Sequence, residues 1–245
     1  MIDFSFKTDI GLVRPINEDN VTIKRLDSGD IVFMVLDGMG GHSKGEKASK
    51  LAMQIILENL EKKNNFLNVV TCRRYLVKSI KRANKEVNIV GSTNMEYLGM
   101  GTTLILGYIF KNKLVMCNIG DSRLYSYDHN LVQLSEDQTY VQFLYKTGKI
   151  KKEDIKIHPK RNVLMNALGT YPSLSIVTKI FNQVPKKLMI CSDGLYNLVE
   201  DDEMMNILQQ DIELDTKVKL LIDKANLNGG LDNIAVGLLE ERLWD

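Results

Sequence analysis

Residues 31–41 of the chain read Ile31-Val-Phe-Met-Val-Leu-Asp-Gly-Met-Gly-Gly41. An apolar run rich in β-branched side chains ends here in an aspartate and a group of glycines. Such a run is typical of a buried strand, and an Asp-Gly pair is typical of the turn that follows one. The stretch therefore predicts a core strand that carries the Asp37 carboxylate at its end.

Three further aspartates lie beside predicted apolar strands. They are Asp121 after residues 114–119, Asp193 after residues 187–191 and Asp232 before residues 233–239. An aspartate in a turn is more often a turn former than a catalytic residue, so none of them decides the function alone. Strand ends at one edge of a sheet core can converge, however, and converging carboxylates repel one another unless a cation neutralises them. Oxygen ligands suit Mg²⁺ or Mn²⁺ rather than zinc.

The remaining pattern predicts a two-sheet core with helices around it. Residues 102–110 and 114–119 are apolar runs separated by a short polar turn, which favours a hairpin, and residues 123–127 return as another strand. Sequential hairpins favour antiparallel sheets over a strictly alternating α/β fold. The spacing of apolar residues predicts helices at residues 45–60, 67–90, 136–148, 201–209 and 216–225.

The composition indicates an ordinary globular protein. The chain has 245 residues, is 44% hydrophobic and carries a net charge of +1, so we do not expect nucleic acid as a partner. Its three cysteines are far apart in sequence, which argues against a disulfide framework or a zinc ribbon. The N-terminus lacks the apolar stretch of a signal peptide, and the longest apolar run is too short to cross a bilayer. We therefore expect a cytoplasmic protein that has no membrane segment.

A series of short motifs runs in order from one end of the chain to the other. They are Thr8-Asp9-x-Gly11-x-x-Arg14-x-x-Asn17-Glu18-Asp19, Asp37-Gly38-Met39-Gly40-Gly41-His42, Gly101-Thr102-Thr103, Gly120-Asp121-Ser122-Arg123, Asp137-x-Thr139, His158-Pro159-x-Arg161, Ala167-Leu168-Gly169, Ser192-Asp193-Gly194-Leu195 and Asp232-Asn233. The series resembles the bacterial branch of the type-2C metal-dependent protein serine/threonine phosphatases, the PPM family. The resemblance implies an α+β fold, a four-layer α/β/β/α sandwich of two antiparallel sheets flanked by helix pairs. It also implies one catalytic domain, residues 1–245, with a small flap at about residues 140–168.

The same resemblance implies a metal centre between the two sheets. Asp37 would bridge two Mn²⁺ or Mg²⁺ ions, the backbone carbonyl of Gly38 would bind the second ion, and Asp193 and Asp232 would complete the shell of the first. A metal-bridged hydroxide would then attack the phosphorus of phosphoserine or phosphothreonine. Two divalent ions that share a water lower its pKa toward neutrality, which suits this chemistry.

Further residues match supporting positions of the family. By resemblance Glu18 and Asp19 act mainly through metal-bound waters, and Asp121 is a ligand of a third, weaker ion. Arg14 matches the arginine that grips the substrate phosphate, and its planar guanidinium can hold two phosphate oxygens at once. The implied partners are phosphorylated proteins, among them a bacterial serine/threonine kinase and its substrates, and relatives of this kind are usually monomers.

Two histidines have alternative interpretations. His42 is either the general acid for the leaving oxygen or a residue that shapes the Gly40-Gly41 turn, and we weigh the two equally. His158 is expected to shape the flap or to touch substrate. The lysine-rich residues 146–161 around it are either a solvated face, which we favour, or a surface that attracts acidic, phosphorylated segments.

Three rival interpretations carry less weight. Cys117 and Arg123 have the spacing of cysteine-dependent phosphatases, but Arg123 opens a strand and Asp121 would put negative charge inside the phosphate loop. The glycines at residues 38–41 lack the lysine and hydroxyl of a nucleotide loop. A non-catalytic module that binds phosphoproteins is the alternative from another class, and the presence of every predicted ligand argues against it.

Overall fold

Two antiparallel sheets form the centre of the molecule. The structure is a computed structural model that describes residues 1–40, 43–63 and 65–241. One sheet has five strands in the order β1-β11-β10-β7-β8, formed by Ile2–Asp9, Ile234–Glu241, Lys187–Cys191, Arg123–Ser126 and Val132–Gln133. The other sheet runs β2-β3-β5-β6-β9, formed by Asp19–Arg25, Ile31–Met39, Leu104–Phe110, Lys113–Ile119 and Val177–Phe181, and β4 (Gly101–Thr102) pairs with β3.

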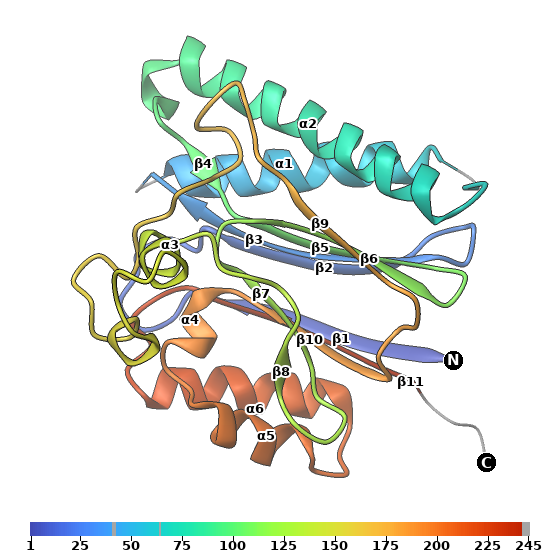
Figure 1. The fold of residues 1–245 in the computed structure, drawn as a ribbon, viewed down its shortest axis with the longest axis vertical. Coiled ribbons are helices and arrows are strands. Elements are labelled where there is room, and N and C mark those ends of the chain that lie inside the picture. The colour runs from blue at the N-terminus through green and yellow to red at the C-terminus, as the bar shows by residue number, and fades with distance from the viewer. Residues whose placement is uncertain (41–42, 64, 242–245) are drawn as a thin grey trace.

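Helices cover the outer face of each sheet (Figure 1). α1 (Ser43–Glu61) and α2 (Val69–Thr93) lie over the six-stranded sheet, and α5 (Asp201–Leu208) and α6 (Leu214–Leu227) lie under the five-stranded one. The four layers follow the order α/β/β/α, which confirms the predicted α+β sandwich. Within the described ranges, no helix is both long and apolar enough to cross a bilayer.

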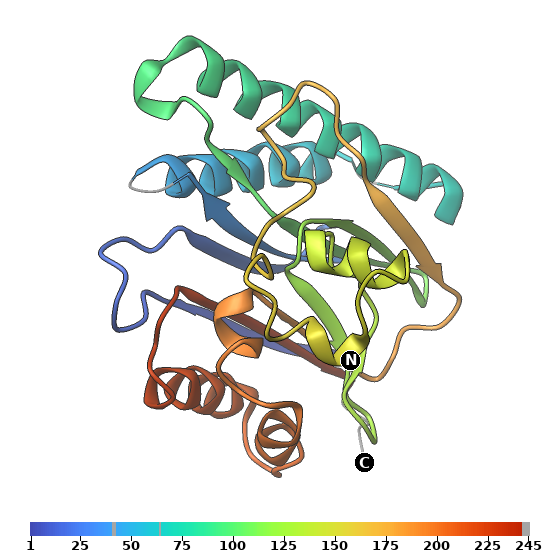
Figure 2. The same cartoon turned by 60° about the vertical axis from the view of Figure 1, so that its left-hand side comes forward.

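The shorter helical elements lie near the ends of the strands. α4 (Asp193–Tyr196) follows β10 directly, and α3 (Tyr140–Lys146) belongs to a segment outside the four layers (Figures 1 and 2). Two single-turn 3-10 helices complete the set, at Met95–Tyr97 and Lys152–Asp154. An isolated bridge between Thr139 and Leu164 joins the two ends of this segment, and a second bridge ties Leu168 to Thr102 of β4.

The position of β3 explains why its sequence is apolar without interruption. Side chains of a strand alternate between its two faces. The even-numbered residues of β3 pack under α1 and α2, and the odd-numbered ones pack between the sheets; the two sets are Val32, Met34 and Leu36, and Ile31, Phe33 and Val35. Both faces of the strand are therefore buried, and neither can be polar.

The main differences from the sequence prediction are four edge strands and one helix. β1, β2, β8 and β9 were not predicted, because edge strands are half exposed and carry the polar residues that interrupt an apolar pattern. The helix predicted at residues 136–148 covers only Tyr140–Lys146, where the Thr139 side chain accepts the N-terminal hydrogen bond from Gln142. Residues 136–138 are instead bonded to β6 and the turn after it, since the Gln138 N–H donates to the Gly120 carbonyl at 2.9 Å.

We expect Gly107→Ala to unfold the protein more easily. Gly107 of β5 lies opposite Phe33 of β3, and a Cβ at this glycine would stand 2.0 Å from Cζ of the phenylalanine ring. The ring would have to leave its place in a packed interior, which lowers the free energy of unfolding by about 1–3 kcal/mol. Urea unfolding followed by circular dichroism measures the loss. The double variant Gly107→Ala, Phe33→Leu should recover part of it, and an unchanged urea midpoint in the single variant would contradict this packing.

Candidate metal centre

Two threonines fix Asp37 at the end of β3. The Asp37 N–H donates to Thr103 Oγ1 at 2.9 Å, and the Asp37 carbonyl accepts from the Thr103 N–H at 2.8 Å and the Thr102 hydroxyl at 2.9 Å. Thr103 Oγ1 also shares a 2.7 Å hydrogen bond with the hydroxyl of Ser122, the neighbour of Asp121. The threonines therefore hold Asp37 and connect it to the turn that carries Asp121.

Asp19 makes a polar bridge between the two sheets. The register of β2 and β3 places it opposite Asp37, and only 3% of it is exposed. Its Oδ2 accepts from the Ser192 hydroxyl at 2.6 Å, and Ser192 Oγ accepts from the Ala235 N–H at 2.9 Å. Because Ser192 follows β10 and Ala235 lies in β11, this chain of hydrogen bonds crosses the sandwich.

Asp193 and Asp232 come from the five-stranded sheet. Asp193 is the first residue of α4, directly after β10, and Asp232 immediately precedes β11. The backbones next to them touch, since a Cβ on Gly194 would stand 1.9 Å from the Asn233 carbonyl oxygen. Only glycine permits this approach, and it places the two aspartates side by side.

The side chain of Asn233 shapes the loop between β1 and β2. Its Nδ2 donates to the carbonyls of Ile10 at 2.9 Å and Ile16 at 3.0 Å, and its Oδ1 accepts from the Glu18 N–H at 2.8 Å. The loop carries both Arg14 and Glu18. One amide therefore sets the course of the backbone for both residues.

Glu18 and Gly38 lie against the start of α1. Glu18 Oε1 accepts from the Gly45 N–H at 3.0 Å, and the Glu18 carbonyl accepts from the Gly38 N–H at 3.1 Å. A Cβ on Gly38 would stand 2.2 Å from the Gly45 carbonyl oxygen. The backbones are packed too closely for any residue but glycine at position 38.

The carboxyl groups raise one another's pKa. Burial is the main cause of the raised pKa of Asp37, and the charges of Asp19, Asp193, Asp121 and Asp232 add to it. Burial and the Asp232 charge raise the pKa of Asp193 to about 6, and burial and the Asp193 charge raise that of Asp121 to about 8. The structure thus brings together five of the predicted ligands, and both sheets contribute to the group.

This donor set fits hard divalent cations. All the side chains offer carboxylate oxygens, and like charges packed together are stabilised by a cation between them. No three Asp, Glu, His or Cys side chains of the described residues stand ready to enclose an ion in their present orientations. The strand ends that carry these carboxylates are nevertheless together.

Arg14 lies at the exposed rim of the cluster. Its Nη2 donates to Asp232 Oδ2 at 2.7 Å, and the two side chains are 48% and 36% exposed. A guanidinium in this position can turn toward an anionic ligand without breaking a buried contact. The structure therefore places Arg14 beside the predicted ligands, as the resemblance implied.

Of the two candidate histidines, only His158 is among the described residues, and it is not part of the cluster. His42 lies outside the described residues, so its role as general acid stays a prediction. His158 has local contacts: its Nδ1 accepts from the Lys160 N–H at 3.1 Å, and its ring centroid lies 6.4 Å from that of Tyr140. These contacts place His158 within the segment at residues 140–168.

Cys117 is unsuited to nucleophilic catalysis. It is fully buried among the residues between the six-stranded sheet and the helices α1 and α2, and burial raises the pKa of its thiol to about 12. Arg123 is held by Asp137 at 2.7 Å and opens β7 rather than a helix. The spacing of the cysteine and the arginine is therefore accidental.

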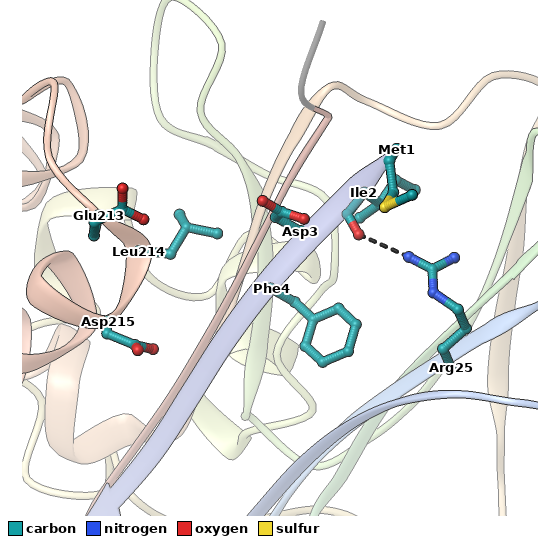
Figure 3. A pocket seen from close by; sticks show the side chains of 8 residues that line it. All are labelled: Met1, Ile2, Asp3, Phe4, Arg25, Glu213, Leu214 and Asp215. Carbon is teal, nitrogen blue, oxygen red and sulfur yellow. Dashed lines mark hydrogen bonds between the residues drawn. The ribbon is translucent and has the colours of Figure 1, made fainter. Parts of the chain in front are cut away.

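A cavity of about 330 Å³ lies at the start of β1, at the end of this strand that is away from the carboxylate cluster (Figure 3). It is lined by Met1, Ile2, Asp3, Phe4, Arg25, Glu213, Leu214 and Asp215. β1 begins at this cavity, whereas the loop with Arg14 and Glu18 follows its other end at Asp9. None of the described site residues lines the cavity, so we assign the chemistry to the carboxylate cluster.

A four-layer α/β/β/α sandwich with clustered carboxylates at its strand ends defines a class of metal-dependent hydrolases. Residues 15–221 match the family described as Protein phosphatase 2C. The chain belongs to this family, and it is a metal-dependent protein phosphatase. The resemblance inferred from the sequence motifs is thereby confirmed.

Individual relatives agree with this assignment over the whole length. The chain is 38% identical to the serine/threonine phosphatase stp of Listeria welshimeri, over 97% of this chain and 95% of that protein. The serine/threonine phosphatase of S. agalactiae superimposes with a TM-score of 0.93 at 28% identity, covering 99% of this chain and 100% of that one. The catalytic domain of the phosphatase PstP, solved in complex with two manganese ions, superimposes with a TM-score of 0.84 at 29% identity. The match covers 98% of this chain and 97% of that one.

The residues that position the aspartates were not assigned roles from the sequence. They are Thr103, Ser122, Ser192 and Asn233. Three of them are direct neighbours of a predicted ligand, and each bears a short hydroxyl or amide side chain. A small polar residue beside a strand-end aspartate is the signal that could have identified them.

The raised pKa of Asp193 predicts that the metal-free protein loses free energy of unfolding as this carboxyl ionises. Its pKa of about 6 exceeds the usual 3.8, so the folded state binds the proton more tightly and stability is lost as the pH rises from about 4 to about 6. In EDTA, the stability advantage of Asp193→Asn over the wild type should grow across this range and reach up to about 3 kcal/mol.

Thermal and urea unfolding between pH 4.5 and 7.5 measure this difference. The control is Asp211→Asn, which changes an exposed carboxylate after α5. Its stability relative to the wild type should be constant over the same pH range. An advantage of Asp193→Asn that is absent, or that shrinks as the pH rises, would show that the Asp193 carboxylate carries no such penalty.

Proposed function

We propose that this chain removes phosphate from phosphoserine and phosphothreonine in proteins, with two divalent cations bound by Asp37, Gly38, Asp193 and Asp232. The observation that carries the proposal is the convergence of carboxylates from both sheets on Asp37. Membership of the 2C family and the 38% identity to a serine/threonine phosphatase support the substrate class. The oxygen donors suit Mn²⁺ or Mg²⁺, and Asp121 provides a third, weaker site.

The residues of the chain hold the reacting groups in place. When bound, the cations supply Lewis-acid chemistry, which activates water at neutral pH and offsets the charge of the phosphoryl group. Asp37 would hold both cations, and this role is supported by its backbone, which Thr102 and Thr103 fix, and by the proximity of its carboxyl to carboxylates of both sheets. Asp193 and Asp232 approach it from the five-stranded sheet.

Arg14 is the proposed substrate-binding residue. Its exposed guanidinium stands at the rim of the site and can form two parallel hydrogen bonds with phosphate oxygens. Glu18 and Asp19 orient water around the ligands. His42 is the candidate for protonation of the leaving oxygen, and His158 is a candidate for contact with substrate.

The segment at about residues 140–168 is the proposed flap of a single catalytic domain, residues 1–245. Three of the six lysines between residues 146 and 160 are paired with acidic side chains: Lys146 with Glu136, Lys151 with Glu153 and Lys156 with Glu200. This pairing supports a solvated face rather than a free cationic surface. We propose that the enzyme acts as a cytoplasmic monomer on phosphorylated proteins, including a serine/threonine kinase and its substrates.

Hydrolysis of p-nitrophenyl phosphate and of a phosphothreonine peptide tests the function. With Mn²⁺ present, turnover should be abolished by EDTA and should survive iodoacetamide, because all three cysteines are buried. Asp193→Ala should lower kcat about 100-fold or more, since it removes a proposed ligand of the cation that activates water. Binding of the peptide without turnover would instead support the phosphoprotein-binding module.

Arg14 should act mainly in substrate capture. Arg14→Ala removes a charged pair of hydrogen bonds to phosphate and should lower kcat/KM about 10-fold to 100-fold, chiefly through KM. Arg14→Lys keeps the charge but loses the planar fork, so an intermediate KM is expected. The matched control is Arg25→Ala at the opposite end of the sandwich, which should leave KM unchanged. Unaltered kinetics in Arg14→Ala would remove Arg14 from the substrate site.

A further inference from the structure

Three side chains form a stack beside Asp121 that the mechanism above does not use. Arg123 donates to both oxygens of Asp137, at 2.7 Å from Nη2 and 3.0 Å from Nε. Its guanidinium carbon lies 3.5 Å from the centroid of the Tyr196 ring. The Arg123 and Asp137 side chains are only 21% and 15% exposed, so this is an internal ion pair with a ring packed on it.

Tyr196 connects the stack to two of the proposed ligands. Its hydroxyl donates to the backbone carbonyl of Asp121 at 3.1 Å. The same residue ends α4, the single-turn helix that begins at Asp193. Burial and the charges of Asp121 and Asp193 raise the pKa of the Tyr196 phenol well above its usual range, so the hydroxyl keeps the proton that it donates.

Arg123 has a second effect on the same carboxylates. Its guanidinium is held near the carboxylates of both Asp121 and Asp193, and its positive charge acts on both of them. The two-point hydrogen bond to Asp137 keeps this charge in place. The stack therefore acts on both aspartates, through a hydrogen bond and through a fixed charge.

We propose that Tyr196 is a positioning residue that sets the affinity of the site for the divalent cation bound at Asp121, with Arg123 and Asp137 holding its ring. The hydroxyl fixes the Asp121 backbone relative to Asp193, and the stacked guanidinium prevents the ring from turning away. The inference rests on the proposed function, since it requires that these two aspartates bind divalent cations.

The test is Tyr196→Phe, which removes one hydroxyl and keeps the ring and its stack. Isothermal titration calorimetry should show Mn²⁺ binding weakened about 3-fold to 10-fold at the weakest site, the range expected for one lost hydrogen bond. The Mn²⁺ concentration that gives half-maximal hydrolysis of p-nitrophenyl phosphate should rise in parallel, with kcat at saturating Mn²⁺ little changed. A stack with only a structural role would lower the unfolding temperature and leave Mn²⁺ affinity unaltered.

The matched control is Tyr125→Phe. It removes the hydroxyl that accepts from Arg123 Nη1 at 2.9 Å, so it perturbs the same network without touching the Asp121 backbone. Mn²⁺ affinity should be unchanged in this variant. Equal weakening in both variants, or wild-type affinity in Tyr196→Phe, would overturn the proposal.

Two further results separate this inference from the function itself. Arg123→Lys keeps the charge but removes the two-point bond and the stack, and it should weaken Mn²⁺ binding in the same direction. If Tyr196→Phe is too unstable to titrate, the Mn²⁺ affinity of Arg123→Lys tests the proposal instead. An Mn²⁺ affinity equal to that of the wild type would then overturn it. Absence of Mn²⁺-dependent hydrolysis in the wild type would refute the proposed function, whereas an active wild type with an unaffected Tyr196→Phe would refute only the role of Tyr196.

Discussion

The structure depends on keeping like-charged carboxylates together in a partly buried place. Asp19 and Asp37 stand opposite each other in adjacent strands, an arrangement that is unfavourable for two negative charges. Proteins retain such arrangements where function needs them, and the rest of the fold supplies the compensating stability. Here the compensation comes from the apolar layers on both faces of β3 and from hydrogen bonds that reach the aspartates from every side.

The aspartates are held mainly through their backbones rather than through their charges. Asp37 is fixed by Thr103, and Asp193 and Asp232 are fixed by the contact between Gly194 and Asn233. The carboxylate of Asp232 accepts hydrogen bonds from Arg14 and from the Asn233 N–H. The carboxylate of Asp193 accepts one from Asn197, so polar groups hold the carboxylates while the strand ends keep their places. This arrangement explains why glycines and small polar residues, rather than bulky ones, accompany each acidic position in the sequence.

Sequence reasoning recovered the parts of the molecule that burial imposes on local pattern. The apolar run of β3, the β5–β6 hairpin and the amphipathic helices were predicted because their periodicity is complete within each segment. The edge strands β1, β2, β8 and β9 were not, because exposed or half-exposed strands lack that periodicity. The strand-end position identified Asp37, Asp121, Asp193 and Asp232, and motif resemblance added Arg14, Glu18 and Asp19. The bond from Ser192 to Asp19 and the stack on Tyr196 depend on pairings between distant segments, which no local pattern contains.

The two sheets share no strand ladder among the described residues, and each contributes part of the carboxylate cluster. What sets their spacing is the apolar filling between them, together with polar links such as those from Asp19 to Ser192 and from Arg25 to the Ile2 carbonyl. Sliding one sheet over the other would therefore change the gap between opposing oxygens at once, without bending either sheet. The apolar side chains between the sheets therefore contribute to the geometry of the proposed metal centre as well as to stability.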